Sequence, residues 1–284
     1  MKCAWKSFVR LLPPYLRDQV DKMGESTLQE LHLRVGLPPI LITSRGMQRI
    51  NTPSTLEDIQ YVVNAASQYS PWSAETVANG YITVEGGHRV GLCGTVIVQS
   101  GSMIGFRRVT SACLRVARDF PGIAEKAKDL TGSVLILGRP GSGKTTLLRD
   151  LIRYRSRSEH GSIVVVDERC EIFPSFSGRM CFETGAHTDV LSGCSKRHGI
   201  ELAIRTMGAG CVAVDEISSE TDCDAIRNAA WCGVPILATA HASDVQDLMK
   251  RTVYKPLAQQ RVFDSILVMQ DNKTWKEAQM RLCT

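Results

Sequence analysis

The stretch SVLILGRPGSGKTTLLRDLI, residues 133–152, decides the fold of this 284-residue chain. Its middle, GRPGSGKT at 138–145, fits the phosphate-loop pattern G-x-x-x-x-G-K-[ST] without a gap. A short apolar run of strand type leads into the loop, and leucines at helical spacing follow it. The stretch therefore predicts a strand, a loop and a helix in the order that phosphate loops require.

The residue types in this loop suit the phosphates of a nucleotide. Glycines let successive backbone N–H groups point inward around a phosphate, and the N-terminus of the following helix adds a favourable dipole. Lys144 would bring positive charge to the β and γ phosphates, and Thr145 would offer its hydroxyl to Mg²⁺. The sequence thus predicts ATP and Mg²⁺ as ligands. The expected phosphate-binding residues are Gly138, Arg139, Pro140, Gly141, Ser142, Gly143, Lys144, Thr145 and Thr146.

Two apolar runs downstream end in acidic pairs that could complete a magnesium nucleotide site. CVAVDEI at 211–217 contains Asp215 and Glu216, and VVDER at 165–169 contains Glu168. One carboxylate at a strand end can hold the water shell of Mg²⁺, and another can orient the water that attacks the γ-phosphate. We assign Asp215 to the metal and Glu216 to the water, with Glu168 as the rival or partner of Glu216.

A histidine and several arginines are further candidates. His241 follows an apolar run at 235–240; it could hydrogen-bond the γ-phosphate or be a strand-end histidine satisfied by backbone. The alternation in LRVAR at 114–118 predicts a strand with Arg115 and Arg118 on opposite faces, so at most one of them would face a given nucleotide. Other arginines, each of which could equally lie on a solvated surface, are Arg107, Arg108 and Arg205.

The pattern of the whole chain indicates two domains. After about residue 120, apolar β-branched runs alternate with helical patterns, which is typical of a parallel sheet covered on both faces. The predicted strands are 133–138, 163–167, 211–215, 236–240 and 265–269. The first third predicts an α+β domain, with strands at 29–35 and 40–43, a helix near 55–69 that starts at a capping box of Ser54 and Glu57, and a β-meander of short strands from 81 to 118. We place an N-terminal α+β domain at 1–120 and an α/β phosphate-loop domain at 121–284.

Composition narrows the class of protein. Hydrophobic residues make up 43% and charged residues 22%, as in ordinary globular chains, and no apolar run is long enough to cross a membrane. Because the N-terminus also lacks the apolar region of a signal peptide, we expect a cytoplasmic protein that reaches a membrane only through partners. The ten cysteines lie singly without a C-x-x-C pair, and we interpret them as free thiols. The net charge of +5 leaves nucleotides, nucleic acids and anionic lipids open as partners.

The order of these motifs resembles the secretion-type ATPases, meaning the enzymes of type II and type IV secretion and the pilus motors. The resemblance rests on the phosphate loop, VVDER, IRTMGAGCVAVDEI (204–217) and ATAHASD (238–244). ELHLRVG (30–36), followed by two prolines, looks like the opening of a pilus-motor N-terminal domain, and the likeness spans about residues 28–270. Two departures are Asp-Glu in place of the motors' usual Gly-Glu at 215–216, and AlaHisAla in place of their commoner Leu-His.

Three further segments resemble a sporulation branch of this family. They are VDERCEI (166–172), DVLSGCSK (189–196) and GGHRVGLCG (86–94). This resemblance would place the protein in the mother cell of an endospore-forming bacterium, where it would power a channel complex in the engulfing membranes. Its expected partners are the membrane channel proteins of that complex, and no nucleic acid is expected.

The resemblance also implies an architecture and roles. It implies a RecA-like C-terminal domain, a smaller N-terminal α+β domain and a ring, typically hexameric, with nucleotide between the domains. By matching position, Glu168 lies in the acidic box, Asp215 and Glu216 in the Walker B region, and His241 in the histidine box. Arg115 or Arg118 would be the N-domain arginine that reaches the nucleotide.

Three other classes of nucleotide-binding protein share some of these sequence features. LSGC at 191–194 partly mimics the signature of ABC-type ATPases, but the 71 residues from Lys144 to Asp215 leave little room for their helical subdomain. A nucleic-acid motor shares the same core and suits a positive net charge, but no segment combines clustered Lys and Arg with stacking aromatics. A non-hydrolysing nucleotide-binding scaffold would not need both acidic pairs.

Overall fold

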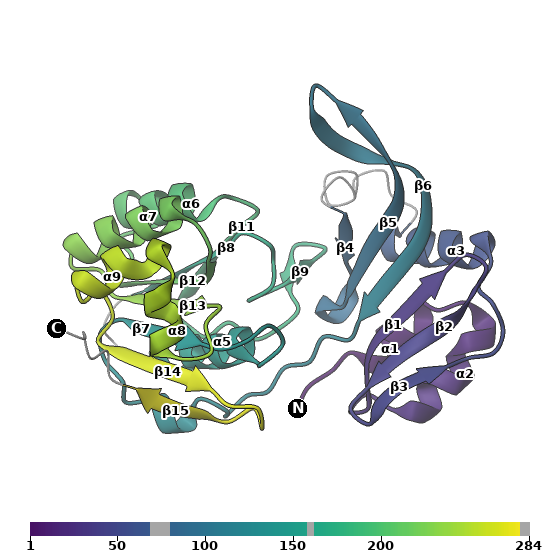
Figure 1. Cartoon of the computed structure of the whole chain (residues 1–284), viewed down its shortest axis with the longest axis horizontal. Helices are drawn as coiled ribbons and strands as arrows, with labels where there is room; N and C mark the ends of the chain where they lie inside the picture. The colour runs from purple at the N-terminus through teal and green to yellow at the C-terminus, as the bar shows by residue number, and fades with distance from the viewer. Residues whose placement is uncertain (69–79, 158–161, 279–284) are drawn as a thin grey trace. The chain divides into compact units, whose positions relative to one another are not determined.

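The computed structural model describes residues 1–68, 80–157 and 162–278, and its internal contacts divide the chain into two units (Figure 1). The first unit is Met1–Asp119 together with Pro174–Phe182. The second is Phe120–Phe173 together with Glu183–Thr284. No helix among the described residues is long and apolar enough to cross a membrane.

The first unit is built on a six-stranded sheet in the order β3-β2-β1-β6-β5-β4, in which every neighbouring pair is antiparallel. The strands are β1 (Leu28–Arg34), β2 (Leu37–Thr43), β3 (Gly46–Arg49), β4 (Tyr81–Thr83), β5 (Arg89–Gln99) and β6 (Ser102–Arg115). The helices are α1 (Trp5–Arg10), α2 (Pro14–Met23), α3 (Leu56–Ser67) and the 3₁₀ turn η2 (Glu85–Gly87).

Apolar and polar residues alternate along β1, and this alternation decides which face of the sheet the helices cover. Leu31 and Leu33 are fully buried in a core shared with α1, α2 and α3. Glu30 and His32 project from the opposite face and are only partly buried, because successive side chains of a strand point to opposite sides. The sheet therefore has an apolar face under the helices and a face that carries polar side chains.

The helix α2 begins at Pro14, the second residue of the Pro13–Pro14 pair, where the missing N–H is harmless. The structure corrects three local predictions in this unit. The helix predicted near 55–69 is α3, but its capping box consists of Thr55 and Asp58 rather than Ser54 and Glu57; residue 69 lies outside the described residues.

The first strand of the predicted β-meander is β4, whereas the short strands expected after it form one long hairpin of β5 and β6. Three register shifts lie along it, the first between Cys93 and Gly94, where a local pattern suggested separate strands. Because β6 ends at Arg115, the prediction of a strand over 114–118 is wrong, and Arg118 lies beyond the strand. The expected alternation of Arg115 and Arg118 across one strand therefore does not hold.

The second unit contains a seven-stranded sheet in the order β11-β8-β12-β13-β7-β14-β15, parallel except for β15. The strands are β7 (Val134–Leu137), β8 (Ile163–Asp167), β11 (Thr188–Ser192), β12 (Cys211–Ile217), β13 (Ile236–Ala240), β14 (Ser265–Met269) and β15 (Trp275–Ala278). The helices are α5 (Lys144–Arg155), α6 (Lys196–Arg205), α7 (Glu220–Trp231), α8 (Val245–Lys250) and α9 (Lys255–Gln259), with 3₁₀ turns η3 (Glu125–Ala127) and η4 (Thr252–Tyr254).

All five strands predicted for this unit are confirmed, three of them at the predicted bounds. The helices α6 and α7 cover one face of the sheet and α5 covers the other (Figure 1). The carboxyl ends of β7, β8, β12 and β13 therefore meet at one edge, which is where an open parallel sheet binds ligands.

One short segment departs from the domain division that the sequence suggested. The strands β9 (Ser175–Phe176) and β10 (Arg179–Met180) pair as a hairpin whose contacts group it with the first unit. A Cβ added to Gly87 of η2 would meet Pro174 Cγ at 2.7 Å and Phe182 Cζ at 3.3 Å. The hairpin thus packs closely on η2, although it lies far along the chain from it.

Candidate nucleotide-binding site

The predicted phosphate loop, residues 138–145, joins β7 to α5 as expected. Gly141 and Gly143 have φ of +72° and +101°, a region that residues with a side chain rarely adopt. A Cβ on Gly138 would lie 2.5 Å from Ser142 Oγ and 2.8 Å from Met269 Cβ, so a side chain there would force its neighbours to shift. The free N–H groups at the start of α5 add the anion-binding end of a helix to the loop.

Lys144 is buried at the first position of α5, where its ammonium group is held by oxygen and nitrogen acceptors. Its Nζ donates to Gly138 O at 2.9 Å, to Arg139 O at 3.0 Å and to His241 Nδ1 at 2.8 Å. Burial lowers the pKa of Lys144, while Glu216 and Asp215 act in the opposite direction. The lysine is therefore kept inside the loop by partners that phosphate oxygens could replace.

His241 links Lys144 to Glu216. An ammonium group can only donate, so Nδ1 of His241 accepts from Lys144 and the ring proton lies on Nε2. Nε2 then donates to Glu216 Oε2 at 2.8 Å. The sequence left open whether His241 only satisfies backbone; it also lies 3.4 Å from Gly138 O, but its short contacts are to the two charged side chains.

Asp215 lies beside the phosphate loop at the end of β12. Thr145 Oγ1 lies 3.3 Å from both carboxylate oxygens of Asp215, and Thr239 Oγ1 of β13 donates to Oδ1 at 3.0 Å. Pairing with β13 is interrupted between Val214 and Glu216, so Asp215 is the extra residue of a β-bulge. The bulge explains how neighbouring residues of one strand, Asp215 and Glu216, both reach groups of the loop region.

The donor set beside Thr145 fits a magnesium ion. Burial raises the pKa of Asp215, and nearby Glu171 raises it further, against the hydrogen bonds from Thr239 and Thr145. A buried carboxylate next to a hydroxyl is an oxygen pair of the kind that Mg²⁺ prefers, and a bound cation would offset the cost of burying its charge. The Ser142 hydroxyl is also buried and makes no hydrogen bond within the described part of the chain, which leaves a donor for a phosphate.

Glu168 and Asp167, the other acidic pair, have different surroundings. Glu168 Oε2 lies 2.6 Å from Lys196 Nζ of α6, and Lys196 is also 3.9 Å from Asp222. Asp167 is fully buried and accepts backbone N–H bonds from Glu171, Ile172 and Phe173 at 2.8–2.9 Å. Burial is the main reason that its pKa is raised to about 6. Asp167 thus fixes the turn after β8, while Glu168 forms an ion pair.

A hollow of about 380 Å³ opens beside the outer side of the phosphate loop. Its lining includes Arg139 and Pro140 of the loop, His241, and residues from 242 to 251 around α8. The hollow is lined by His241, the partner of Lys144, so there is open space next to the phosphate loop on the side of this histidine.

The two N-terminal arginine candidates lie in the first unit and have different partners. Arg115 keeps 63% of its side chain exposed, and its Nε lies 3.1 Å from Glu30 Oε1. Arg118 is half-buried and donates to the backbone carbonyls of Glu25 and Leu28. The guanidinium of Arg118 is therefore held by backbone carbonyls near the start of β1, whereas the guanidinium of Arg115 remains accessible.

Sequence reasoning missed three residues of this site. Thr239 and Lys196 lie in segments that carry the resemblance, ATAHASD and DVLSGCSK, but were given no role. In VVDER the role was given to Glu168 and not to Asp167. A polar residue inside the otherwise apolar run ILATA (236–240) was the one available signal, since an uncompensated hydroxyl in a buried strand needs a partner.

Comparisons with known proteins identify the family that this chain resembles. A family model described as "Sporulation stage III, protein AA" matches residues 7–280. Stage III sporulation protein AA of Bacillus subtilis (strain 168) is 35% identical over 270 residues, which cover 90% of this chain and 88% of that protein. The type IV pilus ATPase PilU of Pseudomonas aeruginosa is 24% identical over 253 residues, which cover 84% of this chain but only 62% of PilU.

Solved structures share the fold. The pilus retraction motor PilT with bound ADP matches with a TM-score of 0.58 at 16% identity, covering 88% of this chain and 76% of that one. The ATPase DotB of Legionella pneumophila matches with a TM-score of 0.54 at 16% identity, covering 94% and 80%. The predicted fold class, a RecA-like P-loop core with a smaller N-terminal α+β domain, is thereby confirmed.

Proposed function

The chain belongs to the sporulation stage III protein AA family, and we propose that it is a Mg²⁺-dependent ATP hydrolase. In this role it powers the assembly of, or transport through, a membrane channel complex during endospore formation. The observation that carries the proposal is the side-chain cluster at the phosphate loop, in which Lys144 contacts His241 and His241 contacts Glu216. The similarity to secretion and pilus ATPases supports the same activity.

The proposal gives each side chain of the cluster one task. Lys144 exchanges its bonds to two backbone carbonyls for bonds to phosphate oxygens, which are stronger because both partners are charged. The third N–H of Lys144 stays on Nδ1 of His241, whose Nε2 stays on Glu216. Glu216 orients the attacking water, because its carboxylate is more accessible than the buried carboxylate of Asp215.

Thr145 and Asp215 hold Mg²⁺ in this proposal, because their oxygen atoms already lie side by side at the loop. When bound, the ion supplies positive charge that stabilises the transferred phosphoryl group. Thr239 keeps the Asp215 carboxylate in place through its hydroxyl.

Two substitutions test this assignment. Lys144→Ala should abolish nucleotide binding, because it removes the buried ammonium group that the loop holds where phosphate would bind. Glu216→Gln should keep binding and lower turnover by about 10²–10⁴-fold, the usual contribution of a positioned base. Binding is measured with a fluorescent ATP analogue and turnover by phosphate release at saturating Mg²⁺.

Glu168→Gln is the matched control, since it changes the same chemical group at the end of the neighbouring strand β8. Because Lys196 already pairs with Glu168, we expect a much smaller loss of turnover than for Glu216→Gln. Retained hydrolysis in Glu216→Gln together with loss in Glu168→Gln would transfer the water-orienting role to Glu168. If Lys144→Ala binds nucleotide normally, the proposal is wrong.

We further propose that the working form is a homo-oligomeric ring, hexameric by family resemblance, held at the membrane by channel proteins on the mother-cell side. Arg115 is the preferred arginine to reach nucleotide in the ring, because Arg118 is occupied by backbone carbonyls. Light scattering with and without a non-hydrolysable ATP analogue should detect a mass increase with nucleotide. A chain that stays monomeric with nucleotide at high concentration would contradict the ring.

The phosphate-release assay also distinguishes a secretion-type motor from a nucleic-acid motor. Stimulation of hydrolysis by anionic vesicles or by a membrane partner agrees with the proposal. Salt-sensitive stimulation by single-stranded DNA or RNA would instead favour a nucleic-acid motor, which is the alternative from sequence.

A further inference from the structure

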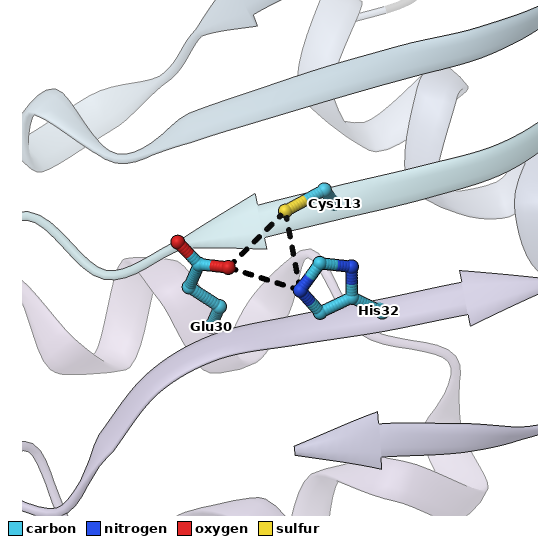
Figure 2. Close-up of side chains that lie close together, drawn as sticks. All are labelled: Glu30, His32 and Cys113. Atoms are coloured by element: carbon cyan, nitrogen blue, oxygen red, sulfur yellow. Dashed lines mark hydrogen bonds and ion pairs between the residues drawn. The ribbon is translucent and has the colours of Figure 1, made fainter. Parts of the chain in front are cut away.

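Three side chains with metal-binding atoms meet on the first unit, away from the phosphate loop. Glu30 and His32 project from β1, and Cys113 projects from the neighbouring strand β6 (Figure 2). His32 and Cys113 are directly paired across the two strands, and Glu30 shares their face because it lies two residues before His32. All three side chains are partly buried, on the face of the sheet opposite the helices.

The distances in this cluster are those of a metal-ligand set. Cys113 Sγ lies 3.7 Å from His32 Nε2 and 3.9 Å from Glu30 Oε2, and the last two atoms are 2.9 Å apart. A tetrahedral Zn²⁺, with bonds of about 2.0–2.1 Å to nitrogen and oxygen and about 2.3 Å to sulfur, sets its ligand atoms about 3.4–3.6 Å apart. To surround such an ion, the contact between His32 and Glu30 must open slightly and the sulfur of Cys113 must move slightly closer to both.

Arg115 orients the carboxylate of this cluster. Its Nε lies 3.1 Å from Glu30 Oε1, the oxygen that faces away from the cysteine and histidine. Oε2 is thereby directed toward His32 and Cys113 (Figure 2). A partner that fixes a ligating carboxylate from outside is typical of protein metal sites.

Space for a fourth ligand lies beside the sulfur. A hollow of about 240 Å³ is lined by His32, Cys113, Gly91 and Cys93 among others. Gly91 is the β5 partner of Cys113, and because it has no side chain it leaves that side of the thiol uncovered. Cys93 lies two residues along β5 and lines the same hollow, where a water molecule can complete the coordination.

We propose that Glu30, His32 and Cys113 bind a Zn²⁺ ion that links β1 to β6. The combination of one thiolate, one imidazole and one carboxylate suits zinc better than Mg²⁺ or Ca²⁺, which take oxygen ligands. No atom changes oxidation state. The Zn–S bond forms as the S–H bond of Cys113 breaks, the proton passes to solvent, and neutral His32 offers its Nε2 lone pair.

The state of Cys113 without metal agrees with this step. Burial raises the pKa of its thiol, Glu30 raises it further, and Arg115 acts in the opposite direction. Without metal, the Cys113 thiol therefore loses its proton less readily than an exposed cysteine does.

The test uses the full-length protein without nucleotide. Zn²⁺ affinity is measured by competition with a chromogenic chelator, and Co²⁺ serves as a spectroscopic probe because a cobalt–thiolate bond gives a charge-transfer band. The wild type should bind one Zn²⁺ tightly and show that band. Cys113→Ser should lose the band and bind Zn²⁺ at least about 100-fold more weakly, since loss of even an outer partner costs about 10–100-fold.

The matched control is Cys232→Ser, because Cys232 is an exposed cysteine in the second unit and should leave both signals unchanged. His32→Gln provides a second ligand variant in case Cys113→Ser folds poorly. Zn²⁺ should raise the melting temperature of the wild type but not that of His32→Gln. A wild type without a cobalt–thiolate band, or with equal Zn²⁺ affinity in Cys113→Ser, would overturn the proposal whatever the nucleotide site does.

Discussion

At the scale of single residues, Asp167 shows how burial turns a carboxylate into a pH-dependent element of stability. Its pKa of about 6 lies above its ordinary value of 3.8, so the folded state holds the proton more tightly than the unfolded state does. Folding is therefore penalised once this carboxylate ionises. The penalty is absent below about pH 4 and complete above about pH 6.

The prediction is that Asp167→Asn removes part of the pH dependence of stability. In the wild type, the free energy of unfolding should fall as pH rises from 4 to 6, and Asp167 should contribute at most about 3 kcal/mol to the fall. Urea unfolding of both proteins at pH 4.5 and 6.5 measures the difference. Because the raised pKa of Asp215 acts in the same direction, the variant keeps a residual slope. Parallel profiles for the two proteins would contradict the role given to Asp167.

The sequence was sufficient for the charged residues of the site but not for how they are connected. Lys144, Asp215, Glu216 and His241 were predicted because each follows or ends a recognisable apolar run at the same sheet edge. The contact of Lys144 with His241 spans 97 residues of sequence, and no local pattern encodes it. The β-bulge at Asp215 is equally invisible, since its cause lies in the pairing of β12 with β13.

At the scale of elements, the sequence did not predict the strand β11 because its position in the sheet does not require an apolar run. The strand β11 lies at an edge of the seven-stranded sheet, with every residue partly or fully exposed, so it lacks the apolar run that marks β8. The cluster of Glu30, His32 and Cys113 escaped for a related reason. Cysteine spacing reports metal sites only when the ligands are close in sequence, and here sheet register joins residues 81 positions apart.

The register shift between Cys93 and Gly94 gives a prediction for the β5 and β6 hairpin. A Cβ on Gly94 would lie 2.0 Å from Arg108 O and 2.9 Å from Val109 Cα, both backbone atoms that cannot move aside alone. Gly94→Ala should therefore destabilise the protein by about 1–3 kcal/mol, the usual cost of overpacking. Gly91→Ala is the control on the same strand, because its Cβ would find its nearest neighbours at 3.7 and 3.9 Å. Equal melting temperatures for the two variants would contradict the bulge geometry.

At the scale of the whole molecule, the division into units does not follow the order of the chain. The boundary after Asp119 lies close to the one that the change of pattern near residue 120 suggested. The hairpin Pro174–Phe182 nevertheless belongs by its contacts to the first unit, although it emerges between β8 and β11 of the second. No sequence pattern predicts that this hairpin belongs to the first unit, because β9 and β10 have two residues each and their partner η2 lies almost 90 positions earlier.

Because the hairpin Pro174–Phe182 belongs to the first unit, we predict that residues 120–284 alone do not form a complete unit. In the full chain, Phe182 is largely buried and packs near Gly87, so the hairpin is held in place at that end. In a 120–284 fragment that contact is lost, and trypsin should cut after Arg179 several times faster than in the full chain. Arg205, exposed at the end of α6 within the second unit, is the internal control and should be cut at the same rate in both proteins. Faster cutting at both arginines would indicate general unfolding of the fragment, whereas equal rates at Arg179 would show that the hairpin does not depend on the first unit.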